Sequence, residues 1–323
     1  MVVKNDDILT GMKQHSGLLA RAYVAPRAKV LYVALNKNAC TSLKWMMARL
    51  CEEDLDRFKA GKAAFIDDSE SVHNRKLWSN GTRVDKISPE LRSQIHPSNG
   101  WFIFAVVRDP RVRLFSAWQN RMLIETPNWR RFHKEHWYPR HPLSRESVIE
   151  DFEKFVNLFY EEDPNHWLLK KDAHCKSQVD LLAESVIPYS RIYDTSELNI
   201  LQSDLEKHLG SQGIDKSLST IPKSNPTPLR PVLELYDNGV KEKIEKIYNQ
   251  DFEKFGKHWT FNKVEKAKSW TREELSLCER EAVLGRRIAE LHSIIKKQGI
   301  AIEALNQGRG IKKTVSRIMT KLR

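Results

Sequence analysis

The stretch KVLYVALNKNACTSLKWMMARL, residues 29–50 of this 323-residue chain, predicts a strand, a loop and a helix in that order. Residues 29–35 are mostly apolar or β-branched and lack a helical period, which is typical of a buried strand. Small and polar residues interrupt the pattern at 36–42, and apolar residues at helical spacing follow up to residue 50. We therefore expect a buried strand whose end leads through a polar loop into a helix.

The same order returns at WFIFAVVRDPRVRLFSAW, residues 101–118. An apolar strand at 101–107 ends in the turn 108–110, and a helix follows from about 111 to 122, with proline near its start, where it is tolerated. Two buried strands that each lead into a helix predict an α/β fold whose central parallel sheet has helices on both faces. Further along, the pattern predicts a strand at 186–193, helices at 195–209 and 233–255, and a Pro-rich loop at 221–231. A helical or irregular lead-in is expected at 1–27.

The charge of the chain, +12 overall, is unevenly distributed. The last sixteen residues, Gly308–Arg323, hold six basic side chains and no acid, so the rest of the chain is only mildly basic. This distribution argues against a general nucleic-acid binder. The four cysteines lack CxxC spacing, so we expect no zinc site and no disulfide framework.

The sequence also bears on the compartment. It contains no apolar run of the ~18 residues that a membrane span needs, and residues 1–20 lack the apolar core of a secretory signal. Together with the scattered cysteines, this predicts a cytoplasmic protein, peripheral at most to the inner face of a membrane.

The first loop has the composition of a phosphate site. At a helix start, free backbone N–H groups and the positive end of the helix dipole attract anions. Thr41 and Ser42 add hydroxyl donors and Lys37 adds a charge, although the loop is no Walker A motif because it lacks GxxxxGK[ST]. An ordinary capped turn is the alternative.

The second loop adds Arg108 at the end of a strand, where its guanidinium can bind a phosphate through two hydrogen bonds, and Ser116 two turns into the helix. We expect Asp109 to cap that helix. Arg111 and Arg113 are expected to form solvated or intrahelical ion pairs.

Together, the two segments resemble the nucleotide-binding signatures of sulfotransferases that use 3′-phosphoadenosine 5′-phosphosulfate (PAPS), and are most similar to the carbohydrate sulfotransferase branch. Residues 36–44 resemble its PKxACTxWK motif, with Asn36 in place of Pro and Leu43 in place of Trp. Residues 108–118 resemble RxPxxRLxSAY, with Trp118 in place of Tyr. Weaker matches follow in order up to Gly256, at 166–167, 175, 189–194, 223–225 and 247–256.

The resemblance implies a fold related to nucleotide kinases, with PAPS as the sulfuryl donor and a hydroxyl of a carbohydrate or glycolipid as the acceptor. No metal is implied. Lys37 would stabilise the leaving 5′-phosphate, and Arg108 and Ser116 would hold the 3′-phosphate. The phosphosulfate would lie against the loop residues Lys37, Asn38, Ala39, Cys40, Thr41 and Ser42. Asn225 would contact the nucleotide, unless it only forms a turn in its Pro-rich loop.

The reaction needs a base for the acceptor proton, and histidine is the expected type. His73 lies between the two motifs, where related enzymes often place a histidine, and is the first candidate. His166 is the rival, although its tryptophan neighbour and helical setting suit a packing role.

Two other functions remain open. The first is a P-loop kinase or NTPase. The sequence lacks the Walker motifs of that class, because the first loop has no GxxxxGK[ST] and the second strand ends in Arg108 rather than in an aspartate. A non-catalytic assembly protein would have little reason to keep Lys37 and Arg108. Related Golgi enzymes carry an anchor and disulfides that this sequence lacks, which suggests an intracellular acceptor. The acceptor itself cannot be identified from one chain.

The end of the chain has a different pattern. Apolar residues recur at alternating spacings of four and three, at Leu284, Ile288, Leu291, Ile295, Ile302 and Leu305, with Gln298 at one place. This heptad pattern is typical of a parallel two-stranded coiled coil, although a helix packed on the globular body is the alternative. We expect a sulfotransferase domain at 1–265 and a short coiled-coil helix at 270–307 that forms a homodimer. A basic amphipathic tail at 308–323 suits an anionic membrane surface, and a solvated, frayed tail is the alternative.

Overall fold

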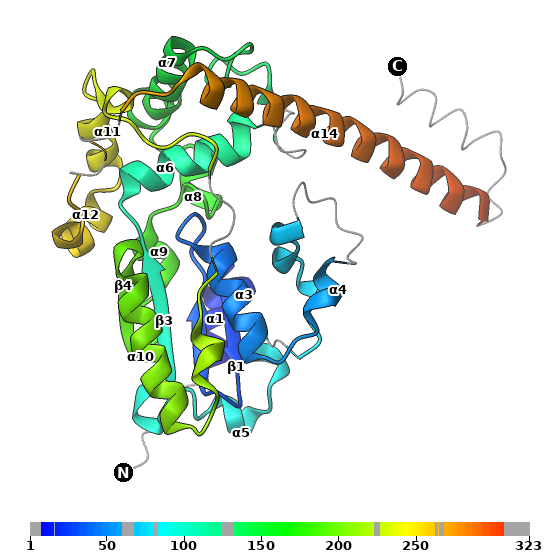
Figure 1. Ribbon diagram of the computed structural model, residues 1–323, viewed down its shortest axis with the longest axis vertical. Coiled ribbons are helices and arrows are strands. Elements are labelled where there is room, and N and C mark those ends of the chain that lie inside the picture. Colours follow the sequence, from blue (N-terminus) through cyan, green and yellow to red (C-terminus); the bar gives the residue numbers. More distant parts are fainter. Residues whose placement is uncertain are drawn as a thin grey trace.

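A four-stranded sheet in the order β1-β2-β3-β4 lies at the centre of the computed structural model (Figure 1). The strands are Ala22–Ala25, Val30–Val33, Phe102–Val107 and Arg191–Asp194. β3 is parallel to both of its neighbours, with Leu31 opposite Ile103 and Ala105 opposite Ile192. The structure describes residues 8–15, 17–59, 68–80, 83–124, 129, 132–222, 227–261, 264 and 268–306.

The lead-in differs from the sequence expectation. It contains the helices α1 (Ile8–Gln14) and α2 (Leu18–Arg21) and also the strand β1, which pairs antiparallel with β2. β1 has only four residues, all buried, and is too short to show a period in the sequence. The sheet is therefore mixed, with one antiparallel edge strand on a parallel core.

Helices cover both faces of the sheet, as the sequence predicted. On one face, α3 (Cys40–Leu50) and α10 (Leu198–Ser211) pack against alternate strand residues such as Tyr32 and Phe104. On the other face, α1 and α9 (Gln178–Leu182) pack against the residues between them, such as Leu31 and Ile103. Alternate side chains of a strand point to opposite faces of the sheet. Because helices cover both faces, the side chains on both faces of these strands are apolar. The α/β fold class is confirmed.

A largely helical layer lies beyond the carboxyl ends of the parallel strands (Figure 1). It contains α6 (Pro110–Trp118), α7 (Arg145–Asn157), α8 (Trp167–Lys171) and α11 (Val240–Ile247), which share one aromatic core around Trp118. α6 and α7 continue as π-helical turns at Gln119–Leu123 and Leu158–Glu162. The remaining helices are α12 (Asn249–Phe255), α4 (Leu55–Lys59), α5 (Pro89–Arg92) and 3-10 turns at Asp68–His73, Arg75–Leu77, Val84–Lys86, Pro97–Asn99, Thr195–Glu197, Lys216–Ser219, Leu233–Tyr236 and Gly256–His258.

The last helix, α14 (Arg272–Asn306), begins on this helical layer and then extends away from it (Figure 1). Near its start, Cys278 is buried, and the Glu279 carboxylate accepts a hydrogen bond from the Leu143 backbone N–H over 2.8 Å. Further along, the heptad residues Leu291, Ile295 and Ile302 are 51 %, 63 % and 57 % exposed. The apolar seam is thus not packed on the body in this part of the helix. The tail at 308–323 lies outside the described residues.

None of the helices described is long and apolar enough to cross a membrane.

Candidate active site

The loop between β2 and α3 has an unusual backbone. Lys37 and Ala39 have φ angles of 68° and 57°, in the left-handed region that non-glycine residues rarely adopt. Ala39 is the N-cap residue of α3, and no side chain caps the helix there. The loop is therefore not the ordinary capped turn that was the alternative, and the helix start keeps N–H groups for another acceptor.

A cavity of about 450 Å³ lies against this loop and brings the two sequence motifs together. The first motif contributes Lys37 and the start of α3, and the second contributes Arg108 and Ser116. Across the cavity lie residues of the 227–231 loop and of the turn after β4. The lining residues are Lys37, Ala39, Cys40, Thr41, Arg108, Ser116, Thr195, Thr227, Arg230 and Pro231.

The cavity is electropositive. Lys37, Arg108 and Arg230 line it, and no acidic residue does among those that the structure describes. Burial lowers the pKa of Lys37 to about 8, and the charges of Arg108 and Arg121 act in the same direction. Burial likewise lowers the pKa of Arg108. Arg230 already pairs with Glu274. Lys37 and Arg108 are buried, which is unfavourable for cations, so this cavity is suited to an anionic ligand.

A second cavity of about 390 Å³ shares Arg108, Thr195, Arg230 and Pro231 with the first. Its other walls include the aromatic side chains of Trp259 and Phe261. The two cavities therefore form a neighbouring pair, one strongly basic and one partly aromatic.

Three of the residues predicted to bind the donor do not line the cavity or cannot be placed, and the predicted base His73 does not line it either. Asn38 is fully buried, and its side chain donates to the Val106 carbonyl over 2.9 Å and to Gln178 Oε1 over 2.7 Å. A direct side-chain contact to a ligand is therefore not supported for Asn38, because its amide points into the core. Ser42 is buried and does not line the cavity. Asn225 lies outside the described residues.

His73 contacts the loop, but both of its ring nitrogens are engaged. Lys44 Nζ lies 2.7 Å from Nδ1, and Thr41 Oγ1 lies 3.0 Å from Nε2. An ammonium group has only donors, so Nδ1 accepts from Lys44 and Nε2 carries the proton toward Thr41. Burial, and next the charge of Lys44, lowers the pKa of His73 to about 2. In this arrangement His73 orients Thr41 and offers no free lone pair.

His166 lies in an aromatic cluster. Its Nδ1 accepts a hydrogen bond from the Leu168 backbone N–H at the start of α8, and its ring contacts Trp137, Phe159 and Trp167. It lines neither of the two cavities described above. These contacts suit the packing role that its sequence neighbours suggested.

Arg111 and Arg113 are buried, so neither forms the solvated ion pair that was one of the two expectations for them. Arg113 is 1 % exposed and donates to the backbone carbonyls of Asn36, Lys176 and Ala173. Arg111 pairs with Asp109 over 2.6 Å, and Asp109 caps α6 as predicted. Arg111 also pairs with a distant residue, Glu245. Long-range partners of this kind leave no local pattern in the sequence.

Sequence reasoning also missed His174, which lies beside the loop. Asp172 Oδ1 is 2.8 Å from its Nδ1, and side-chain nitrogens of Asn36 and Arg121 lie within 2.9 Å of its ring. Burial, and next the charge of Arg121, lowers the pKa of His174 to about 3. The only sequence feature that could have pointed to His174 is its position directly before Cys175, which is one of the weaker matches to the sulfotransferase pattern.

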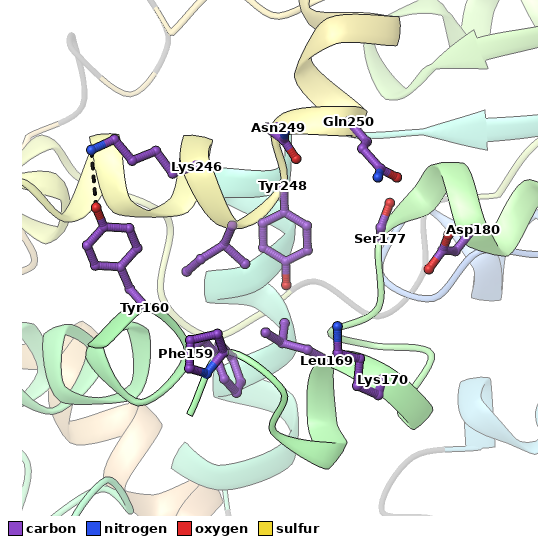
Figure 2. A pocket seen from close by; sticks show the side chains of 12 residues that line it. Phe159, Tyr160, Leu169, Lys170, Ser177, Asp180, Lys246, Tyr248, Asn249 and Gln250 are labelled. Carbon is purple, nitrogen blue, oxygen red and sulfur yellow. Dashed lines mark hydrogen bonds between the residues drawn. The ribbon is translucent and has the colours of Figure 1, made fainter. Parts of the chain in front are cut away.

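A third cavity, of about 390 Å³, lies between the 158–180 segment and the junction of α11 and α12 (Figure 2). Lys246 donates to the Tyr160 hydroxyl over 3.1 Å at its edge. Neither nucleotide motif contributes to this cavity. Among the residues that the structure describes, no cluster of three or more His, Cys, Asp or Glu side chains could hold a metal ion.

Residues 20–258 match the sulfotransferase family. The chain belongs to that family. It is 29 % identical to carbohydrate sulfotransferase 10 of Gallus gallus over 263 residues, which cover 74 % of this chain and 67 % of that protein. No solved structure matches. The matched range contains the two strand–loop–helix units and the cavity between them, so the family assignment and the geometry agree.

The similarity corrects the expected compartment. The relative is a carbohydrate sulfotransferase, a class of Golgi membrane enzymes, so the cytoplasmic assignment was wrong. That assignment rested on the lack of an apolar run and of a cysteine framework, and such absences do not determine where a protein is located.

Proposed function

We propose that this sulfotransferase transfers a sulfuryl group from PAPS to a hydroxyl group of a carbohydrate, free or on a glycolipid. The observation that carries the proposal is the basic cavity that joins the Lys37 loop to Arg108 and Ser116. The similarity to a carbohydrate sulfotransferase supports the acceptor class.

The two ends of the cavity suit the two anionic groups of the donor. Arg108 and Ser116 would bind the 3′-phosphate through charge-assisted and hydroxyl hydrogen bonds. The uncapped start of α3 and Thr41 would bind the phosphosulfate. The partly aromatic second cavity would take the nucleoside, because aromatic walls suit a flat base.

In the transfer, the acceptor oxygen forms a bond to sulfur while the bond from sulfur to the 5′-phosphate oxygen breaks. Negative charge develops on the leaving phosphate, and Lys37 is the cation of the loop that would stabilise it. The acceptor proton passes to a base. His73 stays our candidate because it contacts Thr41, but it could act only if Lys44 moved away from Nδ1; His166 is the alternative.

The assay follows from the chemistry. Purified protein is incubated with ³⁵S-labelled PAPS and separate glycan and glycolipid fractions, and transferred label is measured. Label should enter one class of acceptor, and Arg108→Ala should greatly reduce transfer. If no fraction is labelled by folded protein that binds PAPS, the transferase proposal is contradicted.

Two alternatives are separated by binding. A P-loop kinase would prefer ATP, whereas a PAPS enzyme should prefer adenosine 3′,5′-bisphosphate, the product of the donor. A non-catalytic assembly protein should bind neither with useful affinity. Calorimetry with the two nucleotides therefore distinguishes all three functions.

For the end of the chain we propose a homodimer through the exposed heptad seam of α14 and an anionic membrane surface as a partner of the tail at 308–323. The exposure of Leu291, Ile295 and Ile302 supports the first. The division into a catalytic domain, a coiled-coil helix and a basic tail stays a prediction.

A further inference from the structure

The side chain of Gln178 pairs with the backbone of Arg108 in the way that a neighbouring strand would. Its Oε1 accepts from the Arg108 N–H over 2.9 Å, and its Nε2 donates to the Arg108 carbonyl over 2.8 Å. The same Oε1 accepts from Asn38 Nδ2 over 2.7 Å. Gln178 and Asn38 are both fully buried. One amide therefore connects the backbone of the second motif to the loop of the first.

Asp251, on α12, holds Gln178 in place. Its Oδ2 accepts from the Gln178 backbone N–H over 2.9 Å and from Gln178 Nε2 over 3.3 Å. Its Oδ1 accepts from Ser177 Oγ over 2.6 Å and from the Val179 N–H over 2.9 Å. The carboxylate is fully buried and, among the described residues, pairs with no basic side chain. Four hydrogen bonds from one short segment thus satisfy it and fix the orientation of Gln178.

This connection acts between groups that repel each other. The charge of Arg108 lowers the pKa of Lys37, although burial is the larger cause. A direct contact joins the two residues, from Arg108 Nη1 to the Lys37 carbonyl. The like charges of Lys37 and Arg108 oppose this arrangement, whereas the direct hydrogen bond and the buried amide of Gln178 hold the loop and Arg108 together.

We propose that Gln178, oriented by Asp251, is a positioning residue that sets the separation between the Lys37 loop and Arg108. In this role, Gln178 keeps the distance between the loop and Arg108 matched to the distance between the 3′-phosphate and the 5′-phosphosulfate of the donor. This inference rests on the proposed function, since it assumes a ligand with an anionic group at each end. Neither Gln178 nor Asp251 lines the donor cavity, so both act through Asn38 and the Arg108 backbone.

The test compares two nucleotides by calorimetry: adenosine 3′,5′-bisphosphate, which spans both ends, and adenosine 5′-phosphate, which lacks the 3′ group. Gln178→Met keeps the volume but removes the amide. It should reduce the preference for the bisphosphate by about ten- to a hundredfold, because misplacing one binding group by about an ångström has effects of this size. Binding of the 5′-phosphate should change little.

A matched control separates positioning from lost stability. Leu209→Ala removes a fully buried side chain near the end of α10, away from the cavity lining, and should lower the melting temperature while keeping the preference of the wild type. If Gln178→Met lowers the affinity for both nucleotides equally, or keeps the full preference, the positioning role is contradicted.

Gln178→Glu gives a second readout in case the methionine variant does not fold. The carboxyl group that this substitution introduces can still donate to the Arg108 carbonyl when it is protonated, whereas its ionised form faces the charge of Asp251. The bisphosphate preference of this variant should therefore fall with rising pH, relative to wild type at each pH. A preference that follows wild type at every pH overturns the proposal. If wild type itself does not prefer the bisphosphate, the proposed function fails instead.

Discussion

Arg108 Nη1 donates a hydrogen bond to the backbone carbonyl of Lys37 over 3.0 Å, and so joins two loops that are 71 residues apart in the sequence. The contact uses one nitrogen of the guanidinium at the edge of the basic cavity. It also places the Arg108 charge near the Lys37 ammonium group. The donor site we propose depends on this pair, and the first two predictions test its members.

Arg108→Ala should weaken binding of adenosine 3′,5′-bisphosphate by about 2–4 kcal/mol, because it removes a charge-assisted contact in a poorly hydrated cavity. Isothermal calorimetry measures the loss. Arg83→Ala is the matched control, since Arg83 pairs with Asp85 at the surface, and it should leave affinity unchanged. Wild-type affinity in folded Arg108→Ala protein would show that Arg108 does not hold the 3′-phosphate.

Lys37 should make bisphosphate affinity depend on pH. Its pKa is lowered to about 8 in the free protein, and a bound anion favours the charged form. Below pH 8 the Lys37 side chain is already charged in the free protein. Above pH 8 Lys37 must take up a proton when the bisphosphate binds, so the affinity for the bisphosphate should fall by up to tenfold per pH unit. Lys37→Arg stays charged and should give a flatter profile. Equal slopes for the two proteins between pH 8 and 10 would contradict this assignment.

The role of His73 can be resolved by comparing two substitutions. His73→Ala should keep bisphosphate binding but lower kcat by roughly 10²–10⁴-fold if His73 is the base. His73→Gln can still accept from Lys44 and donate to Thr41, so it retains the observed contacts without basic chemistry. Activity restored by glutamine would identify a positioning role, and equal inactivity of both variants would support the base.

His166→Ala should mainly lower the melting temperature, because His166 caps α8 and packs among aromatic rings. Thermal unfolding and kcat are measured on the same preparation. A large loss of kcat without a change in stability would transfer the catalytic role to His166.

The exposed seam of α14 should make the full chain dimeric. Replacing Leu291 and Ile295 together by Lys should abolish the dimer, since two adjacent core layers of the coiled coil would then hold charges. Sedimentation velocity gives the oligomeric state, and Ser293→Lys, on the outer face of the heptad, is the control. A wild-type monomer at micromolar concentration would disprove the dimer. The tail is assessed separately, by pelleting with anionic vesicles of the full chain and of a chain ending at Gln307.

The sequence by itself determined the local parts of this protein. Runs of apolar residues predicted the parallel strands β2 and β3, and the helical spacing after each predicted α3 and α6, because period and composition act over a few residues. The two motifs also placed Lys37, Thr41, Arg108 and Ser116, which the structure brings to one cavity. These features follow from neighbours along the chain.

Only the tertiary structure decided what surrounds these residues. β1 became part of the sheet by pairing with β2, although four residues show no period of their own. Gln178 and Asp251 meet across 73 residues, and Arg113 is buried against carbonyls from two other segments. The ring nitrogens of His73 are engaged by Lys44 and Thr41. Hydrogen bonds between distant segments have no periodicity, so the environment of each site residue had to come from the folded chain.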